Sequence, residues 1–326
     1  MMRMGGADAF MLAMETPRAY MHTFKVAILD PSTDPDGWSF DKFRRIFEER
    51  LHLIPFLRWK YVDAPLGINH PLWIEDPDFD LDFHLRWIGC PGNGDHRTLC
   101  KLMSDLYAYQ LDRSRPLWKS WVVEGLEGGR VAVVTMLHHA YVDGAGASYG
   151  LEQLFRDVPG YPVEPQPPWQ AQTSPSWLKQ LGLAIVDWPG VVLGNLPKVV
   201  RGVRQKKKLE AQYESEGKPA HPAPGMMRQT PINHVLDYGR TLVCDSITLA
   251  DFKQVSKGLG VTINDVFLCC AAGAIRQLFL EGHYNPDTSP LIAATPFAGK
   301  RPEGMEGLGN FVTLDYCWLH TEIEDP

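Results

Sequence analysis

Two kinds of apolar pattern alternate along the first half of the chain. Apolar runs predict strands at residues 21–29, 117–126 and 130–137. Apolar side chains three or four positions apart predict helices at residues 39–53, ended by Pro55, and 98–111. Glu-Gly-Gly at 127–129 is typical of a hairpin, whereas residues 73–83, rich in aspartate and aromatic side chains, predict a loop at a strand edge. The first half therefore mixes helices with strands.

Prolines separate this half from a second mixed region. They crowd residues 159–175 and 219–231, which is typical of linkers, and flank a stretch at 177–208 that is apolar first and then basic. Farther on, the pattern predicts strands at 241–249, 291–297 and 310–318, and a helix at 262–280 capped by Thr262. We expect an N-terminal domain over 1–160, a proline-rich crossover linker over 161–230, and the beginning of a truncated C-terminal domain over 231–326.

Composition narrows the class of protein. A formal net charge of −7 lacks the basic character that nucleic-acid binding needs. A hydrophobic share of 44% suits a globular protein with a sizeable core, and ten tryptophans need burial or an apolar ligand. The six cysteines show no CxxC motif and no paired framework, which favours a reducing compartment. We see no secretory leader and no clean apolar run of eighteen residues, so no membrane span is expected.

The strongest chemical signal is the heptapeptide HHAYVDG at residues 138–144, directly after the predicted strand 130–137. Histidine is well suited to proton transfer near neutral pH, so one of the pair is a candidate general base. Adjacent residues leaving a strand point to opposite sides, so one of His138 and His139 can face a cleft while the other packs behind it. Two satisfied core histidines are the alternative. A metal site would need a third ligand, none is evident nearby, and no metal is predicted.

Asp143 and Gly144 complete the heptapeptide. A buried carboxylate needs a partner, and Arg113 or Arg115, just before the predicted hairpin, could supply it. We favour an ion pair that fixes the loop over direct chemistry by Asp143. Gly144 is expected to meet a backbone need, either a positive φ or the close approach of a ligand.

Two short segments have both a structural and a functional interpretation. Pro116, Leu117 and Trp118 begin a predicted strand, and a core tryptophan is the favoured interpretation. Asn264 and Asp265 open the second-half helix, where simple capping and a role in the site both stay open. Asn264 is the candidate oxyanion donor.

The basic end of the stretch 177–208 has two interpretations as well. Its cations are Lys198, Arg201, Arg204 and the three lysines at 206–208. A basic amphipathic segment can lie on an anionic membrane surface. A solvated helix face is favoured slightly, because Pro189 and Pro197 are expected to break any long helix.

Further short motifs accompany the heptapeptide along the chain. They are DAF at 8–10, METP at 14–17 followed by Met21-His22, HPLW at 70–73, EDPDFDL at 75–81, LDR at 111–113 with PLW at 116–118, TPIN at 230–233, NDV at 264–266 and GN at 309–310. Together they resemble the bacterial bifunctional wax ester synthase/acyl-CoA:diacylglycerol acyltransferases. That family belongs to the CoA-dependent acyltransferases with a chloramphenicol-acetyltransferase-like fold. The resemblance covers nearly the whole chain.

The resemblance implies a two-domain α/β fold of mixed sheets flanked by helices. It also implies that His139 is the base, with His138 a supporting neighbour and Asp143 a structural carboxylate. Family members continue past this chain's end, so the missing C-terminal portion of the same protein is an expected partner. The segment at 296–301 (PFAGKR) departs from the family's usual Pro-Val-Ser-Leu-Arg pattern, so the resemblance supplies no contact for this loop.

The implied activity is acyl transfer from acyl-CoA, a substrate and not a cofactor, to diacylglycerol or a long-chain alcohol. The product would be a triacylglycerol or a wax ester. The implied location is cytoplasmic, at the inner face of the membrane or at lipid droplets. Two alternatives stay open: a condensation or polyketide-associated acyltransferase that uses a carrier-protein thioester, and a non-catalytic module that binds lipid or CoA.

Overall fold

The computed structural model describes residues 1–155, 173–217, 221–222, 226, 229–286, 291–301, 303 and 308–324. The chain divides into two compact units. The first comprises Met1–Leu193, Asp237–Val243 and Gly299–Phe311, and the second comprises Gly194–Leu236, Cys244–Ala298 and Val312–Pro326. Most of the first proline cluster lies outside the described residues, and the predicted boundaries at 160 and 230 stay predictions.

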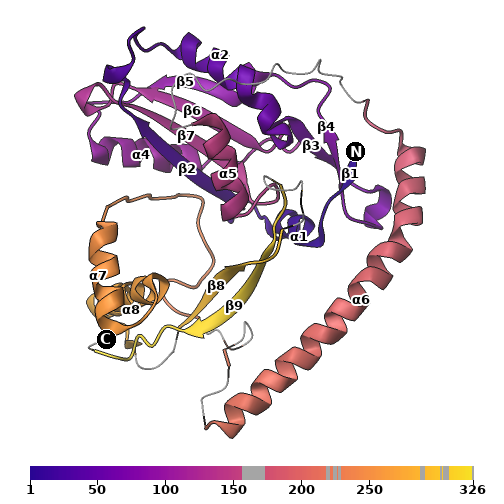
Figure 1. Ribbon diagram of the computed structural model, residues 1–326, viewed down its shortest axis with the longest axis vertical. Coiled ribbons are helices and arrows are strands. Elements are labelled where there is room, and N and C mark those ends of the chain that lie inside the picture. Colours follow the sequence, from indigo (N-terminus) through magenta and orange to yellow (C-terminus); the bar gives the residue numbers. More distant parts are fainter. Residues whose placement is uncertain are drawn as a thin grey trace. The chain divides into compact units, whose positions relative to one another are not determined.

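A four-stranded sheet forms the centre of the first unit (Figure 1). Its strands, in spatial order, are β2 (His22–Leu29), β7 (Val131–His138), β6 (Trp118–Glu124) and β5 (Leu85–Gly89). β7 pairs antiparallel with both β2 and β6, and β5 runs parallel to β6. Every residue of β7 except Thr135 is buried, because the strand is paired on both edges and covered on both faces. The three strands predicted in this half are confirmed.

Helices cover the two faces of this sheet. α2 (Phe40–Arg50) begins at Ser39, whose hydroxyl accepts from the Lys42 amide. α5 (Gly144–Leu154) packs with α2 on the face of Thr135 and Leu137, and α4 (His96–Tyr107) lies on the face of Met136. Both predicted helices of this half are confirmed. The smaller elements are α1 (Gly6–Met14), α3 (Leu81–His84) and an antiparallel sheet of β1 (Met2–Arg3), β4 (Leu72–Glu75) and β3 (Trp59–Val62).

The second unit contains two helices and a hairpin. They are α7 (Leu249–Leu259), α8 (Ile263–Glu281), β8 (Ile292–Ala298) and β9 (Val312–Trp318), with the two strands paired antiparallel. α8 opens on the capping box expected at Thr262 and confirms the predicted helix. The predicted strand at 241–249 is wrong. Residues 241–248 form no regular element, and a strand is stabilised only when another strand accepts and donates its backbone hydrogen bonds.

The prediction that Pro189 and Pro197 break the amphipathic segment is also wrong. α6 is one helix over Trp177–Ser215, 39 residues long. A proline inside a helix removes one backbone hydrogen bond and bends the axis, but it does not oblige the helix to end. Within the described residues, α6 and α8 are long and apolar enough to cross a membrane, a test that core helices of soluble proteins also pass. The expectation of no membrane span therefore stays a prediction.

Candidate active site

The heptapeptide forms the turn between β7 and α5. Tyr141 anchors this turn, because its hydroxyl accepts from the Leu117 amide at 2.7 Å and donates to the Trp59 carbonyl. The Tyr141 ring stacks on Trp73 at 4.8 Å between centroids. Leu117 also accepts from the His138 amide at 2.9 Å. The Pro-Leu-Trp segment at 116–118 thus braces the turn, and the Trp118 indole is buried and donates to a backbone carbonyl.

The two histidines point to different environments. His138 is 1% exposed, and its Nδ1 accepts from the Ala140 amide at 3.0 Å. An accepting Nδ1 leaves the proton of the neutral ring on Nε2. His139 is half-buried, and its backbone amide donates to the Met21 carbonyl at 2.7 Å. The expected divergence is confirmed: His138 packs inside the protein, while the His139 ring stays partly accessible.

A buried ionic cluster lies behind His138. Glu15 is its centre, with carboxylate oxygens 3.5 Å from His138 Nε2 and 3.6 Å from His22 Nε2. The Arg113 guanidinium also donates to this carboxylate. Although burial opposes ionisation, the close approach of the His138 and His22 rings and of the Arg113 guanidinium holds the pKa of Glu15 far below its usual range. Burial lowers the pKa of His138. Arg113 therefore pairs with Glu15. The prediction from the sequence was that Arg113 or Arg115 would pair with Asp143.

The His139 ring is held by an asparagine that the prediction did not include among the site residues. Asn310 Oδ1 lies 2.8 Å from His139 Nδ1. The Nδ2 atom sets the orientation of the Asn310 side-chain amide, because it donates to Asp8 Oδ1 and to the His139 carbonyl, each at 2.7 Å. Only Oδ1 can then face the ring, so Nδ1 carries the proton. The unprotonated nitrogen of neutral His139 is consequently Nε2.

Asp8 completes this arrangement from α1. Its side chain is buried, and Oδ1 accepts from both the amide and the Nδ2 of Asn310. Burial raises the pKa of Asp8, although the bonds from Asn310 oppose the shift. Gly309 has φ +81°, a conformation that favours glycine, and it brings Asn310 against His139. A Cβ added at Gly309 would meet the Phe311 ring at 3.1 Å.

Asp143 binds a different arginine from the two predicted. It caps α5 by accepting from the Gly146 amide at 3.0 Å, pairs with the Arg301 guanidinium, and accepts from the Phe311 amide at 2.9 Å. Arg115 instead lies 3.7 Å from Asp112. The predicted pairing with Arg113 or Arg115 is wrong, and the partner comes from the segment at 296–301 for which the resemblance supplied no contact. The expected kind of contact, an ion pair that fixes the loop, is present.

Gly144 is the first residue of α5. The positive-φ interpretation is wrong, because Gly144 is absent from the residues of positive φ in the described chain. It is exposed, and a Cβ built on it meets nothing within 4 Å. The open space beside it agrees with the second interpretation, room for a ligand, which stays a prediction.

Asn264 and Asp265 lie in the first turn of α8, in the second unit. The Asp265 carboxylate accepts from the amide and the hydroxyl of Thr262, at 2.8 and 2.7 Å. Capping is therefore present, and a part for either residue in the site stays a prediction. Within the described ranges, no group of three histidine, cysteine or acidic side chains could hold a metal ion.

From the sequence alone, four of these residues received no role in the site. They are Asp8, Glu15, Asn310 and Arg301. DAF, METP and GN were quoted for the family likeness, so the signal existed for three of them. A sequence alone does not show which distant residues come into contact, and Asn310 is 171 positions from His139.

Comparisons with known proteins agree on the class of fold. The chain is similar to the solved wax ester synthase/diacylglycerol acyltransferase of Marinobacter aquaeolei VT8, with a TM-score of 0.63, 22% identity, and coverage of 99% of this chain and 67% of the other. It is also similar to the first condensation domain of the CDA synthetase, with a TM-score of 0.56, 15% identity, and coverage of 97% and 68%. The predicted α/β acyltransferase fold of mixed sheets flanked by helices is confirmed.

The family follows from sequence. The model of the wax ester synthase/diacylglycerol acyltransferase catalytic domain matches residues 4–267. A Mycobacterium tuberculosis (strain H37Rv) protein named as a diacyglycerol O-acyltransferase is 45% identical over 329 residues, covering 100% of this chain and 69% of its own length. The chain belongs to the wax ester synthase/diacylglycerol acyltransferase family. The predicted enzyme class, an acyltransferase, is confirmed.

Proposed function

We propose that this protein moves a fatty acyl group from acyl-CoA to the hydroxyl of diacylglycerol or of a long-chain alcohol, with His139 as general base. The family supports acyl transfer. The observation that carries the role of His139 is its bond to Asn310, because a proton held on Nδ1 leaves the Nε2 lone pair free to accept another.

The reaction proceeds by direct transfer. His139 Nε2 takes the hydroxyl proton while the acceptor oxygen attacks the thioester carbonyl carbon. The tetrahedral oxyanion collapses, the carbon–sulfur bond breaks, and the CoA thiolate leaves with the proton that the imidazolium returns. Protons and electrons balance without a covalent acyl-enzyme, a metal or a cofactor. General base catalysis of this kind contributes roughly 10²–10⁴-fold to the rate.

The surrounding polar groups have supporting parts in this scheme. Asn310 and Asp8 form a hydrogen-bonded chain to Nδ1, and their bonds strengthen when the ring becomes an imidazolium. Asp143 keeps its structural part, since its carboxylate already accepts from Gly146, Phe311 and Arg301. Asn264 is proposed as a donor to the oxyanion, where one such donor is worth about 10²–10³ in turnover.

The test is ester formation by the full-length protein from palmitoyl-CoA, with hexadecanol and with dipalmitoylglycerol as acceptors. His139→Ala is expected to abolish ester formation with the melting temperature preserved, whereas the exposed His234→Ala should retain parental turnover. Near-parental turnover by a folded His139→Ala variant would remove His139 from the mechanism. A parental protein that binds palmitoyl-CoA without forming ester would favour the non-catalytic alternative, and activity only with acyl carrier protein would favour the carrier-dependent one.

We further propose that the enzyme works at the cytoplasmic face of a membrane or of a lipid droplet. Apolar side chains of α6, Trp177 and Trp188 among them, are exposed, and exposed cations follow at Arg201, Arg204 and 206–208. Interfacial helices combine apolar side chains with cations in this way. The Arg3–Asp187 ion pair at 2.6 Å anchors the first part of α6 within the first unit.

Vesicle sedimentation tests this location. Binding to vesicles of phosphatidylcholine with anionic phosphatidylglycerol is expected at low salt and should weaken at high salt, because salt screens the cations. Replacing the three lysines at 206–208 with glutamine should reduce binding, while Lys101→Gln on α4 should not. Absence of sedimentation at low salt would end the proposal.

A further inference from the structure

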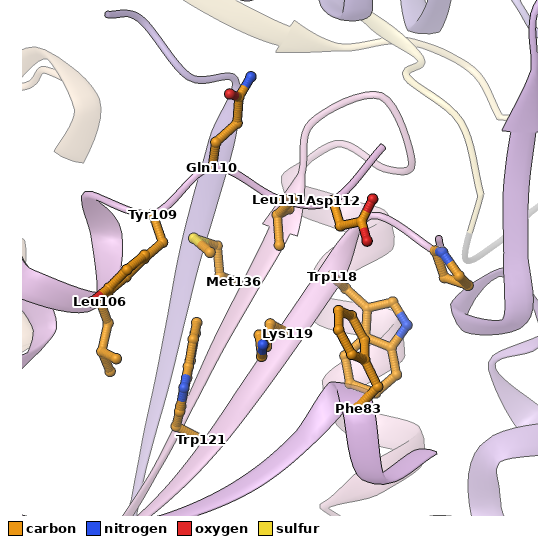
Figure 2. Close-up of a pocket in the computed structure, with 11 residues that line it drawn as sticks. Phe83, Leu106, Tyr109, Gln110, Leu111, Asp112, Trp118, Lys119, Trp121 and Met136 are labelled. Atoms are coloured by element: carbon orange, nitrogen blue, oxygen red, sulfur yellow. The ribbon is translucent and has the colours of Figure 1, made fainter. Parts of the chain in front are cut away.

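A cavity of about 380 Å³ lies in the first unit between α4 and the face of the sheet that carries Met136 (Figure 2). Its apolar wall includes Trp121, Met136, Leu106 and Leu111, all of them buried. Tyr109 is 66% exposed and stands at its edge. His139 is not among the residues that line it. The cavity is therefore distinct from the candidate active site, and its volume lies in the range of small-molecule sites.

A lysine, Lys119, also lines this largely apolar cavity. It lies on β6 opposite Met136 of β7, on the face of the sheet that α4 covers. In the described part of the chain, no carboxylate lies within ion-pair distance of its amine. The amine instead lies over the Phe83 ring, 4.6 Å from the centroid. In Figure 2, Lys119 is drawn between Trp121 and Phe83.

A second cation lies beside the first. The Arg115 guanidinium is 4.2 Å from the centroid of the same Phe83 ring, and its carboxylate neighbour Asp112 is 3.7 Å away and half exposed. Burial and then the positive charges of Arg86 and Arg115 lower the pKa of Lys119, while Asp112 opposes this. The Asp112 carboxylate also lines the cavity, but Lys119 and Arg115 outnumber it, so the apolar wall adjoins a net positive charge. Such an arrangement complements an amphiphile that carries a negative head.

We propose that this cavity binds a single-chain fatty acid, with its carboxylate on the Lys119 amine beside Arg115 and its alkyl chain along Trp121, Met136 and Leu106. If a methylene group takes the ~30 Å³ that a water molecule occupies in the liquid, the cavity holds about a dozen chain atoms. A twelve-carbon acid therefore suits its size. The site rests on the geometry of the first unit alone and does not depend on acyl transfer at His139.

Isothermal titration of the purified chain with dodecanoate, and with dodecanol as the neutral match, tests the proposal. Lys119→Met keeps the length and apolar stem of the side chain but removes its charge. It should weaken dodecanoate binding roughly tenfold to hundredfold, the effect of losing one hydrogen bond between charged groups, and leave dodecanol binding unchanged. Leu106→Trp, which fills the cavity, should weaken both ligands. Lys101→Met on the exposed side of α4 is the matched control and should bind as the parent does.

Three results would overturn the proposal. One is the absence of saturable dodecanoate binding by the parent protein. Another is equal affinity of the parent and a folded Lys119→Met variant for dodecanoate. The third is loss of binding in His139→Ala, which would move the ligand to the candidate active site. Absence of ester formation by the parent would count against the proposed function, but it would leave this cavity and its titration unaffected.

Discussion

The bond from Asn310 to His139 makes a specific prediction about catalysis. Asn310→Ala removes the acceptor 2.8 Å from His139 Nδ1 and the two donors that Nδ2 provides. A hydrogen bond to a charged partner contributes about 1.5–3 kcal/mol, and His139 carries its charge only while it holds the substrate proton. Losing that bond should therefore raise the barrier by about this amount.

A barrier higher by this amount lowers turnover roughly tenfold to a hundredfold. The effect should fall on kcat more than on KM, because the bond strengthens in the transition state and contributes little to substrate binding. It should also be smaller than the effect of His139→Ala, which removes the base itself. Asn310→Ala additionally leaves buried Asp8 without its Asn310 Nδ2 donor, so a lower melting temperature is expected.

The assay is release of CoA from palmitoyl-CoA with hexadecanol as acceptor, followed continuously with a thiol reagent, in the full-length protein. Asn93→Ala, in an exposed loop of the first unit, is the matched control and should retain parental kcat. Turnover of a folded Asn310→Ala variant within twofold of the parent would refute the reasoning. So would a rise in KM at unchanged kcat, since that result would assign Asn310 to substrate binding.

Three further predictions concern stability and the oxyanion. Asp143→Ala should lower the free energy of unfolding by about 3 kcal/mol, measured by urea denaturation, because Arg301 loses a buried partner; a stable but inactive variant would reverse the structural assignment. The folded-state pKa of Glu15 is depressed, so its contribution to stability is present above the ordinary glutamate pKa and is lost as pH falls below it. Glu15→Gln should therefore lower the melting temperature at pH 7, with a gap to the parent that narrows below about pH 4.5; a constant gap would contradict this. Asn264→Ala should lower kcat if its amide serves the oxyanion, and unchanged kinetics would reduce this residue to a part of the helix N-terminus.

The local pattern of apolar side chains was sufficient to predict the helices and strands that bury one continuous surface. The run from Val131 to Leu137 became the central strand, and Phe43 and Phe47 turned inward from the predicted helix. The same local pattern gave a wrong prediction where the segment did not pair with another strand in the described structure. Val243 and Ile247 remain exposed in a segment that alternates like a strand but pairs with no strand in the described part of the chain. The pattern also gave a wrong prediction at Pro189 and Pro197, which lie inside one continuous helix.

The candidate site was only partly predictable for the same reason. The adjacency of His138 and His139 on a strand end predicted that one ring would be buried and the other accessible. The groups that decide the chemistry of these rings come from far along the chain. Glu15 joins Arg113 across 98 positions, and Arg301 joins Asp143 across 158. No local spacing distinguishes Arg301 from the nearer Arg113 or Arg115, so tertiary structure was needed to choose the partner.

The protonation pattern of His139 is the most direct test of the account. Nitrogen NMR of histidine-labelled protein at a pH where His139 is neutral reports which ring nitrogen holds the proton. Assignment by comparison with the His139→Ala spectrum should show Nδ1 protonated and Nε2 bare in the parent protein. The preference should be lost in Asn310→Ala. A proton on Nε2 of parental His139 would contradict the account, because the nitrogen proposed to take the substrate proton would already be occupied.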